Sequence, residues 1–117
     1  MPRRANPAAA APLLKSSAPV FAALGDSTRL QLVDRLCNSG PQSIAQLTSG
    51  TRVTRQAITK HLHVLAGAGL VHGLRTGRET LWELMPNQLR DAQRFLDTIS
   101  IRWDDALARL QDKLERE

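Results

Sequence analysis

Apolar residues in the first third of the chain recur three and four positions apart, which is the spacing of one face of an α-helix. Residues 16–25 carry such a stripe and end at a glycine, a frequent helix C-terminus. A second stripe follows Asp-Ser-Thr at 26–28, and each of these three residue types caps helix N-termini well. We therefore predict two helices, with the inward residues Val20, Phe21 and Leu24 in the first and Leu30, Val33, Leu36 and Cys37 in the second.

Two further helices are predicted before residue 70. Ser43 precedes a short apolar segment that stops at Gly50, so we expect this serine to cap a short third helix. Thr54 is expected to cap a fourth helix in the same way, and glycines at 67 and 69 end it. The residues expected to face the core are Ile44 and Leu47 in the third helix and Ile58, Leu62 and Leu65 in the fourth.

Beyond residue 70 the pattern changes to strand residues around the turn sequence RTGR, which predicts a β-hairpin. Pro86 closes the hairpin and precedes a last helix over residues 87–116. The third and fourth helices are joined by a short glycine-containing turn. This order of elements predicts a mainly α fold with a small β-hairpin, namely a winged helix-turn-helix with a long C-terminal helix.

The chain length of 117 residues suits a single domain. Residues 1–13 are rich in Pro and Ala and include a twin arginine, but they contain no continuous apolar segment of the kind that a signal peptide needs. We therefore expect residues 1–13 to be a disordered tail and residues 14–117 to form the domain.

Charge is unevenly distributed along the chain. The formal net charge is +5 and the sequence pI is about 10.7, which favours polyanionic partners. From Leu36 to Arg78 there is no Asp or Glu, whereas both signs mix after residue 87. The single cysteine excludes an intramolecular disulfide, and no apolar run approaches the ~20 residues that span a bilayer. We expect a cytoplasmic protein without membrane association.

The polar face of the fourth helix carries the clearest candidate chemistry. Gln56, Thr59, Lys60 and His63 lie opposite its core stripe, and Arg55 lies in its first turn. Such side chains hydrogen-bond base edges and phosphates, and a helix N-terminus attracts phosphate. The alternatives are an ordinary solvated helix face and a hairpin whose charges prevent edge-to-edge pairing. The expected DNA-binding residues are Arg52, Thr54, Arg55, Gln56, Thr59, Lys60, His63, Arg75 and Arg78.

The histidines are poor candidates for a metal site. His61 falls at the edge of the core stripe, so we expect it to be half-buried and hydrogen-bonded to backbone. His61 and His63 are two residues apart and point in different directions, whereas helical metal sites use His at i and i+4 or Cys/His clusters. We predict no metal and no cofactor. A metal-responsive alternative remains, through His63 or His72 with acids from a partner chain. The absence of a nucleophile elbow or phosphate loop argues against an enzyme.

The last helix carries an apolar stripe at alternating steps of three and four, typical of a helix–helix seam. A domain this small cannot easily cover so long a stripe, so we expect a two-fold homodimer; the first helix of the same chain is the other possible occupant. A two-fold dimer would place two recognition helices about 34 Å apart and so favour a palindromic operator. The expected interface residues are Val20, Phe21, Leu24, Leu89, Ala92, Leu96, Ile99, Trp103, Leu107 and Leu110, within dimerisation helices at about 16–25 and 87–116.

Three segments resemble the ArsR/SmtB family of bacterial winged-helix repressors: FAALGDSTRLQLVDRL (21–36), SIAQLTSGTRVTRQAITKHLHVLAGAGLV (43–71) and RTGRETLWEL (75–84). The resemblance implies a homodimeric repressor that binds double-stranded DNA at palindromic operators. It also implies that Thr54, Arg55, Gln56, Thr59 and Lys60 form the DNA-reading face, with His61 in the family's KHL position.

Metal-sensing members of that family carry a Cys-rich motif near the third helix or Asp/His ligands on the last one. Here QSIAQL has no cysteine and residues 87–117 have no histidine, which indicates a branch without that chemistry. The effector is not evident from the sequence. The competing hypothesis is a winged-helix module that binds another protein and no DNA.

Overall fold

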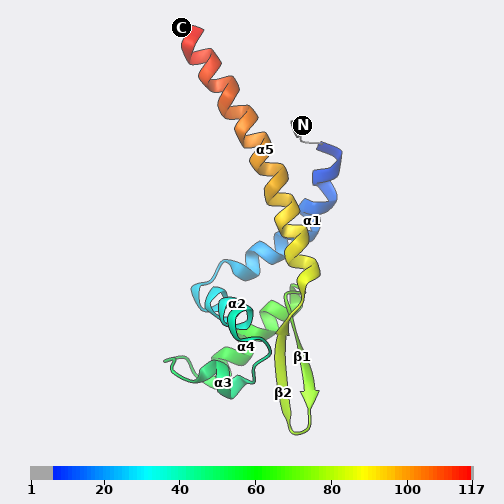
Figure 1. Ribbon diagram of the computed structural model, residues 1–117, viewed down its shortest axis with the longest axis vertical. Coiled ribbons are helices and arrows are strands. Elements are labelled where there is room, and N and C mark those ends of the chain that lie inside the picture. Colours follow the sequence, from blue (N-terminus) through cyan, green and yellow to red (C-terminus); the bar gives the residue numbers. More distant parts are fainter. Residues whose placement is uncertain (1–6, 117) are drawn as a thin grey trace.

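The computed structural model describes residues 7–116 and forms a helical protein with one two-stranded antiparallel sheet. The elements are α1 (Pro7–Leu24), α2 (Ser27–Ser39), α3 (Ile44–Thr48), α4 (Arg55–Gly67), β1 (Val71–Thr76), β2 (Glu79–Leu84) and α5 (Pro86–Arg116). The predicted mainly α fold with a hairpin and a long last helix is confirmed. Figure 1 shows α2, α3, α4 and the hairpin gathered at one end, with α1 beside α5 as it leads away from them.

The start of α1 corrects the predicted tail. The helix begins at Pro7, so positions 7–13 are helical, and residues 1–6 of the predicted tail lie outside the described residues. Alanine has the highest helix propensity of all residues, and proline is well tolerated in the first turn, where its missing N–H has no helical partner. The alanines at 8–11 behind Pro7 therefore favour helix, although their composition resembles that of a linker.

The buried face of α2 also differs from its prediction. Of the predicted residues, Leu36 is buried and Val33 packs half-buried against the core, whereas Leu30 is 50% exposed and Cys37 is exposed. Leu32, which was not predicted, is buried. The N-cap fixes the start of the helix, because the side chain of Asp26 accepts a hydrogen bond from the backbone N–H of Arg29 at 3.0 Å. Packing then buries Leu32 and Leu36, which lie four residues apart on one face, in preference to the competing stripe that begins at Leu30.

The core lies where α2, α3, α4 and the base of the hairpin meet. Both predicted caps are present: Ser43 and Gln46 form a reciprocal capping box on α3, and the Thr54 hydroxyl accepts from the N–H of Ala57 on α4 at 3.1 Å. These caps fix the rotation of each helix. The predicted inward residues Leu47, Ile58, Leu62 and Leu65 are all buried, and Ile44 packs against them half-buried.

The hairpin is attached to the helical part by a contact that the sequence did not predict. Gln42, which precedes α3, pairs with Trp82 of β2 as an isolated antiparallel bridge. The Gln42 N–H donates to the Trp82 carbonyl at 3.0 Å, and the Trp82 N–H donates back at 2.8 Å. The base of the hairpin is thereby held next to the start of α3.

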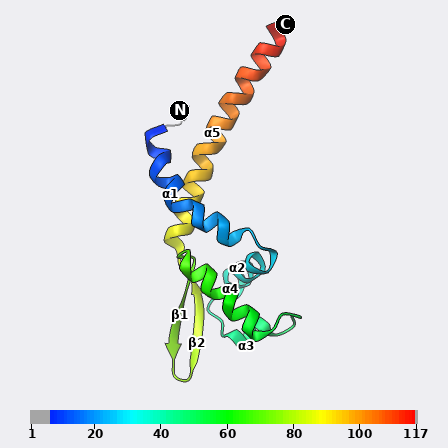
Figure 2. The same ribbon diagram turned by 180° about the vertical axis from the view of Figure 1, so that it is seen from behind.

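Part of the predicted dimer face is already covered inside the chain. Val20 is fully buried and Ala92 is 3% exposed where α1 packs on α5, and the rings of Phe21 and Phe95 lie 5.9 Å apart. Val20 and Ala92 therefore offer no surface to a partner, which corrects their assignment to an interface. The C-terminal part of α5 extends past α1, as the view from behind shows (Figure 2). The apolar residues of α5 that remain exposed are Leu89, Leu96, Ile99, Trp103, Leu107, Leu110 and Leu114.

Candidate nucleic-acid interface

The outer face of α4 presents polar side chains that the core stripe positions. Ile58, Leu62 and Leu65 are at most 1% exposed, so the opposite side of the helix must face outward. Arg55, Gln56, Lys60 and His63 are accordingly exposed, while Thr59 is half-buried at the edge of this face. Thr54 and Arg52 precede the helix and are exposed too. The structure thus brings together the residues predicted on this face.

Three of these side chains are free to bind a ligand. Within residues 7–116, the side chains of Arg55, Gln56 and Lys60 make no hydrogen bond and no ion pair. The two threonines differ, since the Thr54 hydroxyl caps the helix and the Thr59 hydroxyl donates to the Arg55 carbonyl at 2.8 Å. The face therefore combines two cations and one amide with open hydrogen-bonding capacity.

The hairpin tip adds a second cationic feature. Arg75 and Arg78 flank the turn and are exposed, with Thr76 paired to Glu79 at the end of the ladder. Gly77 has a φ of 63°, a left-handed conformation that glycine adopts without steric cost. The Nε–H of Arg75 donates to the Gly77 carbonyl at 3.3 Å, which leaves the rest of its guanidinium available.

His63 lies on the side of α4 that approaches the hairpin. Its ring centroid is 6.1 Å from that of Trp82, with the ring planes tilted by 53°. The ring is exposed beside the hairpin. His72 is paired differently, because its Nε2 lies 2.5 Å from Oε1 of Glu83 on the opposite strand.

His61 is half-buried as predicted, but its partner is a side chain and not the backbone. Its Nδ1 lies 3.3 Å from a guanidinium nitrogen of Arg29 and 3.9 Å from the carboxylate of Asp26. The Nε–H of Arg29 also donates to the Ala23 carbonyl at 2.5 Å. This one side chain therefore links the last turn of α1 to α4. Because the partners are 32 residues apart, helical periodicity gave no signal for the contact.

The carboxylate of Asp26 belongs to the same cluster. The backbone N–H of Arg29 stabilises its charged form and is the main reason that the pKa of Asp26 lies below its usual value. Coulombic interactions with Arg29, and then with His61, lower the pKa of Asp26 further, against the opposing effect of desolvation. This group is an ionised helix cap at neutral pH.

Arg35 is a second positioning residue that sequence reasoning missed. From α2 its guanidinium donates to the carbonyls of Leu47 at 2.5 Å and of Gln46 at 2.9 Å. The last carbonyls of a helix have no partner within the helix, so this arginine satisfies acceptors at the end of α3. It fixes the first helix of the helix-turn-helix against α2.

Comparison with known proteins agrees with this geometry. A family model described as a helix-turn-helix domain matches residues 24–73. The transcriptional repressor SmtB of Mycobacterium tuberculosis is 30% identical over 95 residues, which are 81% of this chain and 68% of that protein. The structure of an ArsR-like transcriptional regulator from Rhodococcus sp. RHA1 is similar with a TM-score of 0.72 and 36% identity, over 85% of this chain and 92% of that one. The chain belongs to the ArsR/SmtB family.

Members of the ArsR/SmtB family are transcriptional regulators, and this chain is a regulator and not an enzyme. Another similar structure is a homodimeric winged helix-turn-helix DNA-binding domain from Mycobacterium bovis, with a TM-score of 0.58 and 25% identity over 90% of this chain and 92% of that one. The described part of the chain has no helix long and apolar enough to cross a membrane.

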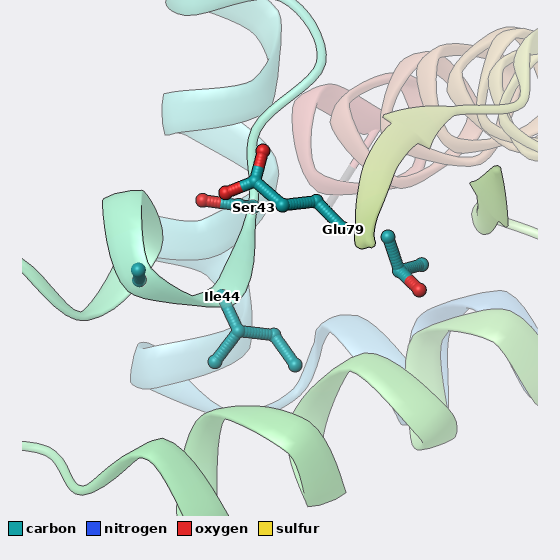
Figure 3. A pocket seen from close by; sticks show the side chains of 5 residues that line it. Ser43, Ile44 and Glu79 are labelled. Atoms are coloured by element: carbon teal, nitrogen blue, oxygen red, sulfur yellow. The ribbon is translucent and has the colours of Figure 1, made fainter. Parts of the chain in front are cut away.

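Two further features of the structure concern metal and phosphate binding. Over residues 7–116, no three His, Cys, Asp or Glu side chains gather as they would around a metal ion. A metal site completed by acidic residues of a partner chain stays a prediction. An open hollow of about 220 Å³ lies between the start of α3 and β2, lined by Ser43, Ile44, Ala45, Glu79 and Thr80. Figure 3 shows the Glu79 carboxylate directed toward Ser43, an acidic lining that disfavours phosphate there.

Proposed function

We propose that the protein is a homodimeric transcriptional repressor that binds a palindromic operator through α4 and the wing. The observation that carries this proposal is the outer face of α4, where the side chains of Arg55, Gln56 and Lys60 are exposed and have no hydrogen-bond or ion-pair partner within the described residues. Acidic residues are absent from Leu36 to Arg78, so α4 and β1, the first strand of the hairpin or wing, carry only positive formal charges.

In the proposed complex, α4 and the hairpin contact different parts of the DNA duplex. The first turns of α4 enter the major groove, where an arginine pairs with guanine and a glutamine with adenine. Lys60 and Arg52 neutralise phosphates on either side, and His63 lies where it faces the backbone near the wing. Arg75 and Arg78 extend from the hairpin tip toward the phosphates or into the adjacent minor groove.

The exposed stripe of α5 is the proposed dimer interface. Leu96, Trp103 and Leu110 are each more than half exposed, which is unusual for large apolar side chains that recur along one helix face. The similar domain from M. bovis is homodimeric, and SmtB is a repressor, which supports carrying both properties to this chain. A two-fold dimer reads two half-sites about one DNA turn apart, so the operator is palindromic.

The test is binding of fluorescent promoter DNA from the protein's own gene region at several salt concentrations. Each phosphate contact adds about 0.9 to the magnitude of the slope of log affinity against log salt, and the dimer carries two copies of Lys60, so Lys60→Ala should lower that magnitude by about 2. Arg90→Ala is the matched control, because Arg90 is an exposed cation on α5 and belongs neither to α4 nor to the hairpin tip. Its slope should equal that of the unmodified protein.

Two results would overturn the proposal. Absent or salt-insensitive binding would favour a module that binds another protein through the same fold. An equal change of slope in the Lys60 and Arg90 variants would show that the net charge, and not the α4 face, determines binding.

A further inference from the structure

Thr59 differs chemically from its neighbours on the outer face of α4. Its hydroxyl donates to the Arg55 carbonyl at 2.8 Å, and the side chain is half-buried. A hydroxyl carries a single proton, so Thr59 has no donor left for a base or a phosphate. The hydrogen bond also restricts rotation about χ1 and thereby fixes the direction of the γ-methyl group.

The residues around Thr59 supply donors without needing it. Arg55 lies one helical turn earlier, and neither its side chain nor that of Gln56 or Lys60 has a hydrogen-bond or ion-pair partner within residues 7–116. In the major groove, thymine is the base that presents a methyl group, and a threonine methyl is one of the side-chain groups that pack against it. A methyl group among free donors therefore adds a type of contact that they do not provide.

We propose that Thr59 determines specificity by packing its γ-methyl against the C5-methyl of a thymine in each half-site. This inference rests on the proposed operator binding and adds a base to it. Four residues of helix rise about 6 Å and base pairs are about 3.4 Å apart, so the thymine lies one or two base pairs from the base that Arg55 contacts.

The test uses deoxyuridine, which lacks only the C5-methyl group of thymidine. A duplex is first selected from a random library by the unmodified protein, and each thymine is then replaced by deoxyuridine, in both half-sites at once. One replacement should weaken binding about fourfold per half-site, or about fifteenfold in the symmetric duplex, as expected for the loss of one buried methyl-sized contact. The other replacements should have little effect.

Two variants separate the methyl from the hydroxyl. Thr59→Ser keeps the hydroxyl and its backbone hydrogen bond, so it should bind the thymine duplex about as weakly as the unmodified protein binds the deoxyuridine duplex, and should not distinguish the two. Thr59→Val keeps the methyl in an isosteric side chain and should retain the discrimination. Circular dichroism confirms that both variants are folded.

The inference is overturned if a sequence-specific operator is bound and no deoxyuridine effect depends on Thr59. A preference for adenine or cytosine at that position, lost in Thr59→Val but kept in Thr59→Ser, would instead assign the contact to the hydroxyl oxygen as an acceptor and would also overturn it. If no duplex is selected, the proposed function itself fails, which is a distinct result.

Discussion

Trp103 gives the sharpest test of the proposed dimer, because its indole is the largest exposed apolar group on α5. It is 64% exposed in the single chain. Tryptophan buries up to ~250 Å² in an interface, so a partner could cover roughly 100–160 Å² of it. At about 25 cal/mol per Å² this is about 2.5–4 kcal/mol per protomer, and the two-fold axis doubles it to about 5–8 kcal/mol.

Trp103→Glu removes this area and adds a carboxylate to the apolar stripe. Association also costs side-chain ordering, so the full area value is an upper bound, and we expect the dimer dissociation constant to rise at least about a hundredfold. Sedimentation over a range of protein concentrations measures it directly. Operator affinity should fall in parallel, since the half-sites would be bound one at a time.

The control is Ala108→Glu, which adds the same charge to the same exposed part of α5 but on the side away from the stripe. It should leave the dissociation constant nearly unchanged. Circular dichroism should show equal helix content in both variants, because Trp103 contributes little to the core of the single chain. An unchanged dissociation constant in Trp103→Glu would refute the assignment of α5 as the interface.

Three further changes test how the helix-turn-helix is held. Arg35→Ala leaves the Leu47 and Gln46 carbonyls without their donor, so the free energy of unfolding in urea should fall by about 1–3 kcal/mol, whereas Arg90→Ala should change it by less than about 0.5 kcal/mol. Gly69→Ala puts an alanine at a left-handed φ of 76° and its Cβ 2.7 Å from Gln88 Cγ. Gly77→Ala has a similar φ of 63° but open space around the Cβ, so the melting temperature should fall more in Gly69→Ala than in Gly77→Ala. The pKa of Asp26 is lowered in the folded chain, so its stabilising effect is present above the carboxyl pKa of the unfolded chain and is lost as pH falls through the folded value. The free energies of unfolding of the parent and of Asp26→Ala, measured over a pH series, should therefore converge below about pH 4. A difference between them that widens in acid would contradict this.

Local signals were sufficient to predict α4 and its exposed face. An N-cap threonine and a stripe at i, i+4 and i+7 leave one rotation possible, so the outward positions follow from the sequence alone. In α2, the leucines and valine between 30 and 36 permit two stripes, and only packing against α1, α4 and β2 selects one. The contacts of Arg35 and of Gln42 with Trp82 join residues 11 to 40 positions apart, which periodicity does not register. Composition likewise misled at the N-terminus, since alanine is frequent in both linkers and helices.

The contacts of Arg29 suggest how the two proposed surfaces depend on each other. A palindromic operator requires two α4 helices about 34 Å apart, and that distance is set by the helices that form the dimer. Arg29 joins the last turn of α1, which packs along α5, to His61 on α4. A shift of α1 against α5 would therefore be transmitted to α4 through Arg29, without any ligand touching α4. Because binding energies are linked, an effector that prefers one α1–α5 arrangement must change operator affinity by the same factor by which the operator changes effector affinity. We accordingly expect a compound that binds at the α1–α5 interface to change operator affinity through the contacts of Arg29.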